Sequence, residues 1–208
     1  MTDIERLADE SSGGRGHVLL VSPLTFSYHE SISETLVSLG YAVTWWNDRP
    51  SNAIWYKIAL RLFPSITIRL SEKAFLDRLQ EIESSSISHV LVIKGEGVSR
   101  NVTEKIRKKL PSASMGLYLW DGIDNVKQAF DILPVFDSVS TFDPGDARKY
   151  GWRYRPLFWR NISLSKKAVS SPSYDWCFIG TVHSDRHRVI HRLRDRYKNI
   201  YRSFVFCY

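Results

Sequence analysis

Short apolar runs alternate with amphipathic segments along the first 160 residues. Runs of apolar and β-branched residues predict strands at residues 17–22, 41–46, 89–94, 115–120 and 138–142, and a further extended segment at 154–158. Apolar residues at helical spacing predict helices at residues 28–39, 54–68, 72–83, 99–109 and 124–133, and a helical turn at 144–150. Ser71 is expected to cap the third of these helices. Strands that alternate with helices are typical of an α/β fold, in which a parallel sheet carries helices on both faces.

The pattern changes at residue 161. Residues 161–173 contain five serines, two lysines and a proline, which is typical of a linker. A strand at 175–180, a basic helix at 185–198 and a strand at 203–207 follow. Because a β-α-β unit cannot enclose a core by itself, residues 174–208 are expected to be the truncated start of a second domain. The first domain is expected at residues 17–160, after a disordered tail of polar and acidic residues at 1–16.

Composition and charge restrict the class of protein. The chain has 208 residues, of which 43% are hydrophobic, and this argues against general disorder. Its net charge of +7 is unevenly distributed, because residues 1–147 hold 15 basic and 19 acidic residues whereas residues 148–208 hold 14 and 3. A uniformly basic surface, as on a histone-like protein, is therefore excluded. The excess indicates either a polyanionic ligand near the C-terminal part or a basic face that another element covers.

The sequence favours a cytoplasmic protein. Two cysteines cannot form a disulfide framework, no CxxC pair is present, and the polar start is no signal peptide. No apolar run of about 18 residues predicts a membrane span. The segment 54–68 fits a core-facing helix best, although Lys57 and Arg61 beside its apolar positions leave open a helix that lies on the inner membrane surface.

Several candidate functional residues follow predicted strands. In parallel sheets, ligands collect where the strands end. Asp121 and Asp143 follow the fourth and fifth strands, where carboxylates can bind sugar hydroxyls or accept a proton from one. Turn formation and helix capping are the structural alternative for both residues. His29, in the first of these loops, is a candidate base, although a capping or packing role is more common for such a residue.

Glu96 lies between two glycines after the third predicted strand. The Gly95–Gly97 turn matches only part of the dinucleotide-binding pattern, because Arg100 stands where the last glycine belongs. Glu96 is therefore a candidate acid, base or hydroxyl-binding residue in a loop that substrate approaches. The alternative is a tight turn in which glycine permits a positive φ.

The start of the basic helix is the best candidate for a contact with a diphosphate. Gly180 and Thr181 follow a strand, and Arg186 opens the helix, where backbone N–H groups and a guanidinium attract phosphate. The alternative is that these residues only form the start of the helix, with Ser184 or Asp185 as its N-cap. The chain lacks a P-loop, and the histidines near this helix do not favour a metal site. An apolar stripe on the helix argues against nucleic acid as a partner.

Two segments resemble one known family. Residues 118–159 (YLWDGIDNVKQAFDILPVFDSVSTFDPGDARKYGWRYRPLFW) and 174–190 (YDWCFIGTVHSDRHRVI) are similar to elements of the CgeB-like bacterial glycosyltransferases. The similarity extends over about residues 17–198, and its motifs agree in order and spacing although each is degenerate. Family members continue for well over a hundred residues beyond the end of this sequence.

The resemblance implies a GT-B fold, in which two Rossmann-like domains face a cleft. The first domain would bind a glycan acceptor and the second a nucleotide-sugar donor, and no bound metal or other cofactor would be needed. Gly180, Thr181 and Arg186 would lie near the donor diphosphate, and Asp121, Asp143 and Glu96 would line the acceptor side. This chain alone is then expected to transfer little sugar.

Two other classes stay open. The first is a non-catalytic α/β protein that binds or assembles with a separate donor-domain chain. The second is another nucleotide-binding α/β protein, such as a flavodoxin-like or receiver domain. The receiver pattern is disfavoured, because Ser22-Pro23 and Lys94-Gly95 stand where its acidic residues belong.

Overall fold

A computed structural model describes residues 6–7, 14–25, 27–48, 58, 62–83, 86–158, 173–180 and 185–207. The chain divides into two compact units, Met1–Arg160 and Asn161–Tyr208, and each is described by itself. The division lies at the residue where the sequence pattern changes.

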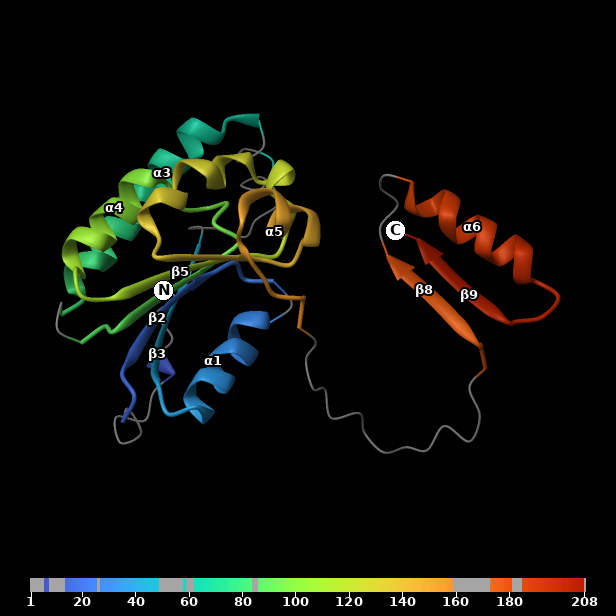
Figure 1. The fold of residues 1–208 in the computed structure, drawn as a ribbon, viewed down its shortest axis with the longest axis horizontal. Coiled ribbons are helices and arrows are strands. Elements are labelled where there is room, and N and C mark those ends of the chain that lie inside the picture. The colour runs from blue at the N-terminus through green and yellow to red at the C-terminus, as the bar shows by residue number, and fades with distance from the viewer. Residues whose placement is uncertain are drawn as a thin grey trace. The chain divides into compact units, whose positions relative to one another are not determined.

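The first unit is built on a seven-stranded sheet in the order β1-β3-β2-β4-β5-β6-β7 (Figure 1). The strands are β1 (Arg6–Leu7), β2 (His17–Ser22), β3 (Ala42–Asn47), β4 (His89–Ile93), β5 (Ser114–Leu119), β6 (Ser138–Thr141) and β7 (Arg153–Tyr154). Six of these strands, β2 to β7, pair in parallel, and β1 joins the edge of β3 antiparallel. The predicted α/β fold, a Rossmann-like parallel sheet, is confirmed.

The order of the strands decides where a ligand can approach. The chain builds outward from β2 to β3 on one side and from β4 to β7 on the other. The strand order therefore reverses between β2 and β4, and in such sheets ligands bind beyond the carboxyl ends of the strands at this point. We call the side of the sheet where β2 to β7 end the carboxyl edge.

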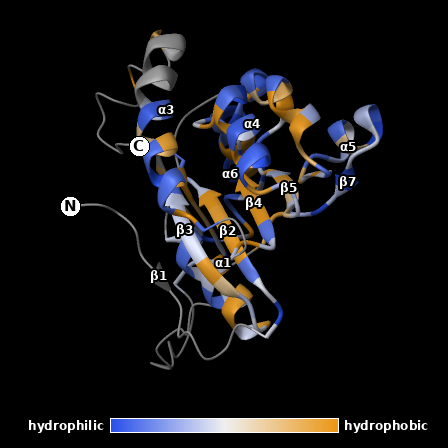
Figure 2. Cartoon of the chain, turned by 90° about the vertical axis from the view of Figure 1, so that its left-hand side faces the viewer, coloured by the Kyte–Doolittle hydropathy of each residue, from blue (hydrophilic) through white to orange (hydrophobic). Residues whose placement is uncertain are grey.

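Helices cover both faces of the sheet (Figure 1). The segments are α1 (Tyr28–Ser38), α3 (Pro64–Glu81), α4 (Arg100–Lys109), α5 (Pro144–Tyr150) and the 3-10 segments η1 (Ile123–Asn125), η2 (Lys127–Asp131) and η3 (Leu133–Val135). Phe75 and Leu79 of α3 and Ile106 of α4 pack into the larger core, whereas Ile32 and Leu36 of α1 pack against a smaller one. Figure 2 shows hydrophobic positions along the central strands and hydrophilic ones along the outer sides of α3 and α4.

Three sequence predictions need correction. Ser71 does not cap a helix, because α3 already begins at Pro64, whose fixed φ suits a first helical position, and Ser71 is buried inside the helix. Residues 124–133 do not form an α-helix. They form parts of three short 3-10 segments, in which a carbonyl oxygen accepts a hydrogen bond from the N–H three residues later. Arg6 and Leu7, expected in a disordered tail, form β1, because an open strand edge can pair with any backbone.

Of the predicted helix at residues 54–68, residues 54–57 and 59–61 lie outside the described residues, and residues 64–68 belong to α3, which continues to Glu81. The boundary predicted between this helix and the next is therefore wrong, whereas the core-facing and membrane-surface interpretations of the segment stay predictions. Among the helices that the structure describes, none is both long and apolar enough to cross a membrane.

The second unit is a β-α-β element. It comprises β8 (Trp176–Gly180), α6 (Arg186–Tyr197) and β9 (Ser203–Cys207), and the two strands pair in parallel. Cys177 lies opposite Phe204, and Ile179 lies opposite Phe206, so these four residues share one face of the small sheet. All four are exposed, and this sheet face is therefore apolar and uncovered within the described residues.

Candidate functional site

Three charged side chains meet at the carboxyl edge of the first unit. Nζ of Lys94 lies 2.9 Å from Oε2 of Glu96 and 3.0 Å from Oδ2 of Asp121. Lys94 follows β4 directly, and Asp121 lies two residues beyond β5, so the ion pairs join the loops of neighbouring strands. We call Lys94, Glu96 and Asp121 the ion triad. Its lysine was not among the candidates that the sequence suggested, whereas both of its carboxylates were.

The backbone of Lys94 adopts a conformation that is unusual for lysine. Its φ is +69°, in the left-handed region, and Gly95 follows with a φ of +74°. The N–H of Lys94 donates to the carbonyl of Tyr118 at 2.8 Å, which ties the turn to β5. A left-handed residue other than glycine costs about 1 kcal/mol and persists only where its surroundings hold it. The fold therefore fixes the position from which the Lys94 side chain reaches both carboxylates.

The lysine of the triad remains a cation over a wide pH range. Burial lowers the pKa of Lys94, but hydrogen bonds and charges from Glu96 and Asp121 outweigh this effect and leave the pKa above its ordinary value. The side chains of Lys94 and Glu96 are each 22% exposed and that of Asp121 is 40% exposed. The triad is thus partly withdrawn from water, with Asp121 as its most accessible member.

Gly97 allows the loop after β4 to pack closely against the loop after β3. A Cβ atom on Gly97 would lie 2.1 Å from the carbonyl oxygen of Asp48, so no larger residue fits without movement. Gly95 has the positive φ that the sequence predicted for a tight turn. The glycines of this turn thus serve contacts within the protein, which accounts for them without a bound dinucleotide.

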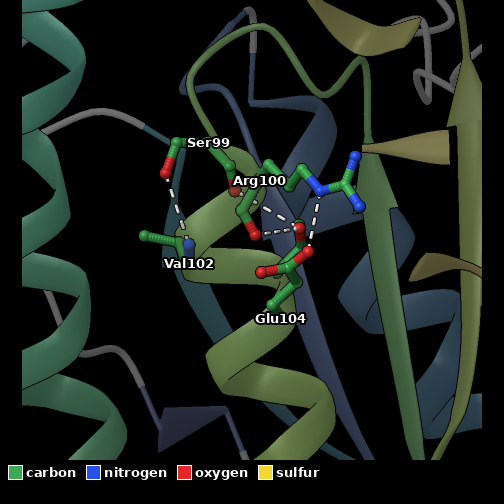
Figure 3. Close-up of polar contacts among 5 residues, drawn as sticks. Ser99, Arg100, Val102 and Glu104 are labelled. Carbon is green, nitrogen blue, oxygen red and sulfur yellow. Dashed lines mark hydrogen bonds and ion pairs between the residues drawn. The ribbon is translucent and has the colours of Figure 1, made fainter. Parts of the chain in front are cut away.

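Side chains of the protein form hydrogen bonds and an ion pair at the N-terminal end of α4 (Figure 3). Oγ of Ser99 accepts from the N–H of Val102 at 3.3 Å and donates to Oε1 of Glu72. Arg100 pairs with Glu104 one turn along, with Nε 2.7 Å from Oε1. The predicted helix from residue 99 is therefore confirmed, with Ser99 as its N-cap.

Aromatic rings gather at the same carboxyl edge. Tyr28, at the start of α1, makes edge-to-face contacts with Trp120 at 5.9 Å and with Phe158 at 5.5 Å between ring centroids. Trp120 directly precedes Asp121, and Phe158 is 39% exposed. We call Tyr28, Trp120 and Phe158 the ring trio. Because Trp120 and Asp121 are neighbours, the ring trio and the ion triad share the loop after β5.

Asp143 has a capping role in the structure. Its Oδ1 atom accepts from the N–H groups of Gly145 at 2.6 Å and Asp146 at 2.9 Å, at the start of α5. Oδ2 of Asp146 in turn accepts from the N–H of Ile123 at 2.8 Å, which ties α5 to the loop after β5. These bonds match the capping alternative, and the structure places no bond between Asp143 and the ion triad among its described contacts.

His29 lies inside the protein. Its residue is only 3% exposed, and its ring stacks on Trp45 with centroids 4.1 Å apart. The first turn of α1 presents His29 to the sheet, and Nε2 approaches Oε1 of neighbouring Glu30 to 4.0 Å. A substrate at the surface could not reach this imidazole, and packing is the role that the structure supports.

The candidate phosphate residues of the second unit are only partly described. Gly180 ends β8, where a Cβ atom would approach Cζ of Phe178 to 3.0 Å, and Arg186 is the exposed first residue of α6. Thr181 lies outside the described residues. A pocket of about 500 Å³ in this unit lies at the C-terminal end of α6, beside Tyr174 and Arg194. It therefore does not coincide with the predicted contact.

The ion triad and the ring trio together offer chemistry suited to a sugar. Carboxylates accept hydrogen bonds from hydroxyl groups, and the partly exposed rings of the trio, of which Trp120 also packs against the smaller core, are apolar surfaces suited to the C–H groups of a pyranose. Among the described residues, no group of three or more His, Cys, Asp or Glu side chains has an arrangement that could hold a metal ion. In comparisons with known proteins, no family model, curated protein or solved structure matches the chain.

Proposed function

We propose that the first unit binds a glycan acceptor at its carboxyl edge and acts as the acceptor-side domain of a glycosyltransferase. The donor would be a nucleotide-sugar, and the resemblance to the CgeB-like family motivates this reaction class. The observation that carries the proposal is the convergence of Glu96 and Asp121 on Lys94, next to the ring trio. In this arrangement Asp121 would accept hydroxyl hydrogen bonds while Trp120 packs on a sugar face.

A glycan-binding protein without catalysis is the second candidate. Both carboxylates of the ion triad already accept from Lys94, and the other candidate bases have structural roles: His29 is buried and Asp143 caps α5. These contacts favour hydroxyl binding over proton abstraction in the described part of the site. The two candidates therefore share the acceptor site and differ in whether sugar transfer occurs there.

Binding is tested first, on the full chain. Saturation-transfer NMR against a panel of neutral methyl glycosides and short oligosaccharides should detect binding, and Trp120→Ala and Asp121→Asn should each weaken it at least about fivefold. Tyr41→Ala is the matched control, because Tyr41 pairs with His89 by an edge-to-face contact at the opposite edge of the sheet. Equal losses in Tyr41→Ala and Trp120→Ala would show that the effect is structural, and absence of binding would overturn the proposal.

Catalysis is tested separately. Thermal shifts with UDP, GDP, CMP and dTDP sugars, followed by transfer of radiolabelled sugar to whichever glycan binds, distinguish the two candidates. Transfer supports the glycosyltransferase. Because the chain alone is expected to transfer little sugar, the same assays are repeated on the chain extended by a donor-binding domain. Glycan binding with neither a nucleotide-induced shift nor transfer in the extended chain supports the binding protein.

A further inference from the structure

Helix α6 of the second unit exposes a row of arginines. The half-buried residues of this helix lie along one side of it and are His187, Ile190 and Tyr197. Arg188, Arg192 and Arg196 follow one another at intervals of four residues, so they line up on the opposite side of the helix. All three are exposed. We call Arg188, Arg192 and Arg196 the arginine row.

Carboxylates of the described residues do not neutralise the arginine row. The one acidic residue of α6, Asp195, pairs with Arg194 at 3.6 Å, and the ion pairs among described residues include no member of the row. Arg196 lies over the ring of Tyr197 at 5.7 Å from its centroid, a contact that leaves its N–H donors for a ligand. Because four residues of an α-helix rise about 6 Å, the row suits several anionic groups arranged side by side.

Exposed apolar side chains border the arginine row. Val189 is 47% exposed and Leu193 is 41% exposed. Arg192 and Arg196 follow them by three positions, so each apolar residue has an arginine of the row as its neighbour on the helix surface. A nucleic acid backbone offers phosphates without an apolar layer, whereas the phosphates of a lipid bilayer lie directly above acyl chains. The combination of cations and exposed apolar side chains therefore favours a membrane surface over a nucleic acid.

We propose that the exposed side of α6 binds the surface of a membrane that contains anionic phospholipids. The guanidinium groups of the arginine row would bind lipid phosphates, and Val189 and Leu193 would enter the boundary between headgroups and acyl chains. Residues 186–198 hold six basic residues, and clusters of about four to eight on an amphipathic helix are typical of such binding. This surface belongs to the second unit, so its binding does not depend on glycan binding by the first unit.

Sedimentation with lipid vesicles tests the proposal on the full chain. Vesicles of phosphatidylcholine alone are compared with vesicles of phosphatidylcholine mixed with phosphatidylglycerol, which is anionic. We expect the wild type to bind the mixed vesicles at least about tenfold more tightly than the neutral ones. Added salt should weaken this binding, because it screens the charges on both surfaces.

Two triple variants with the same change in net charge locate the binding surface. Replacing all three arginines of the row by glutamine, which has a similar helix propensity, should weaken binding to the mixed vesicles at least about tenfold. The matched control replaces three exposed lysines of the first unit by glutamine and should bind like the wild type. These lysines are Lys73, Lys105 and Lys108. Circular dichroism verifies that both variants keep their helix content.

A single variant tests the apolar contact. Val189→Ser keeps every charge and has nearly the same helix propensity, and it should weaken binding to the mixed vesicles about threefold or more. Binding of the wild type to a DNA duplex is measured at the same salt concentration, and we expect it to be weaker than binding to the mixed vesicles.

Each outcome bears on a different statement. Equal binding to neutral and mixed vesicles, or binding to neither, would overturn the proposal and leave glycan binding intact. Equal losses in the two triple variants would show a general charge effect and would overturn the assignment to the arginine row. Tighter binding to DNA than to the mixed vesicles would make nucleic acid the partner and overturn the membrane, and unchanged binding by Val189→Ser would overturn the apolar contact.

Discussion

Nζ of Lys94 and Oδ2 of Asp121 lie 3.0 Å apart, across two neighbouring strands of the sheet. The residues are 27 positions apart in sequence, and α4 and β5 separate them. The contact joins the turn after β4 to the loop that carries Trp120. The ion pair that links these two loops therefore uses a side chain of the proposed glycan-binding site.

Removing the cation should loosen this edge. Lys94→Met would remove the cation that contacts both Glu96 and Asp121, and we expect the free energy of unfolding to fall by about 1–2 kcal/mol, less than for a fully buried pair. Urea denaturation measures the change. Lys108→Met, on the exposed side of α4, is the control, and Lys94→Arg should retain most of the stability. A Lys94→Met variant as stable as the control would contradict a structural role for the ion triad.

Asp137 should make the fold sensitive to acid. The Arg107 hydrogen bond, supported by the N–H of Met115, lowers the pKa of Asp137 below its ordinary value of 3.8. A carboxylate with a lower pKa in the folded state stabilises the fold above its unfolded pKa, and this stability disappears as pH falls through the folded value.

Wild type should therefore lose more stability than Asp137→Asn between about pH 5 and pH 2. Because the Asp137 side chain is 52% exposed, solvent screening keeps the difference small, about 0.5 kcal/mol or less. Urea denaturation across this pH range tests it, and parallel pH profiles for the two proteins would refute the assignment.

Gly97 should tolerate no side chain. Gly97→Ala would place a Cβ atom 2.1 Å from the carbonyl oxygen of Asp48, so the loops after β3 and β4 must separate. We expect a loss of about 1–3 kcal/mol in the free energy of unfolding. Gly14→Ala is the control, since no described atom lies within 4 Å of a Cβ atom there. Equal thermal unfolding temperatures for the two variants would show that the loops are not in close contact.

Asp143 should affect stability without affecting glycan binding directly. Asp143→Ala removes the acceptor for two N–H groups and should cost about 1 kcal/mol, whereas Asp143→Ser retains a capping oxygen and should recover most of that loss. Chemical denaturation and the glycan-binding assay are measured together. If Asp143→Ser is stable but binds glycan poorly, Asp143 contacts the ligand and the capping account is insufficient.

Much of the fold was predictable because the apolar runs encode buried strands directly. The strand predictions at 17–22 and 138–142 agree with β2 and β6 to within a residue, since each is a short run between turn residues. The 3-10 segments were not predicted, because their apolar positions, such as Ile123 and Ile132, are also compatible with an α-helix. The pairing of β1 depends on an open edge of β3 and leaves no pattern in sequence.

The candidate site was only half predictable. Asp121 and Glu96 were found because they follow strands, and residues at that place converge in a parallel sheet. Lys94 was missed because its importance depends on a left-handed backbone and on a partner 27 residues away, neither of which has a local signature. Conversely, His29 fits a candidate base in sequence, and only the fold shows that the ring stacks on Trp45.

The exposed face of β8 and β9 carries its own chemical handle. The thiol of Cys177 shares this face with Ile179, Phe204 and Phe206. With Cys207 replaced by serine, a thiol-reactive dye would attach at one position, without an engineered cysteine. Its reaction rate and emission would then report directly whether any molecule covers the face.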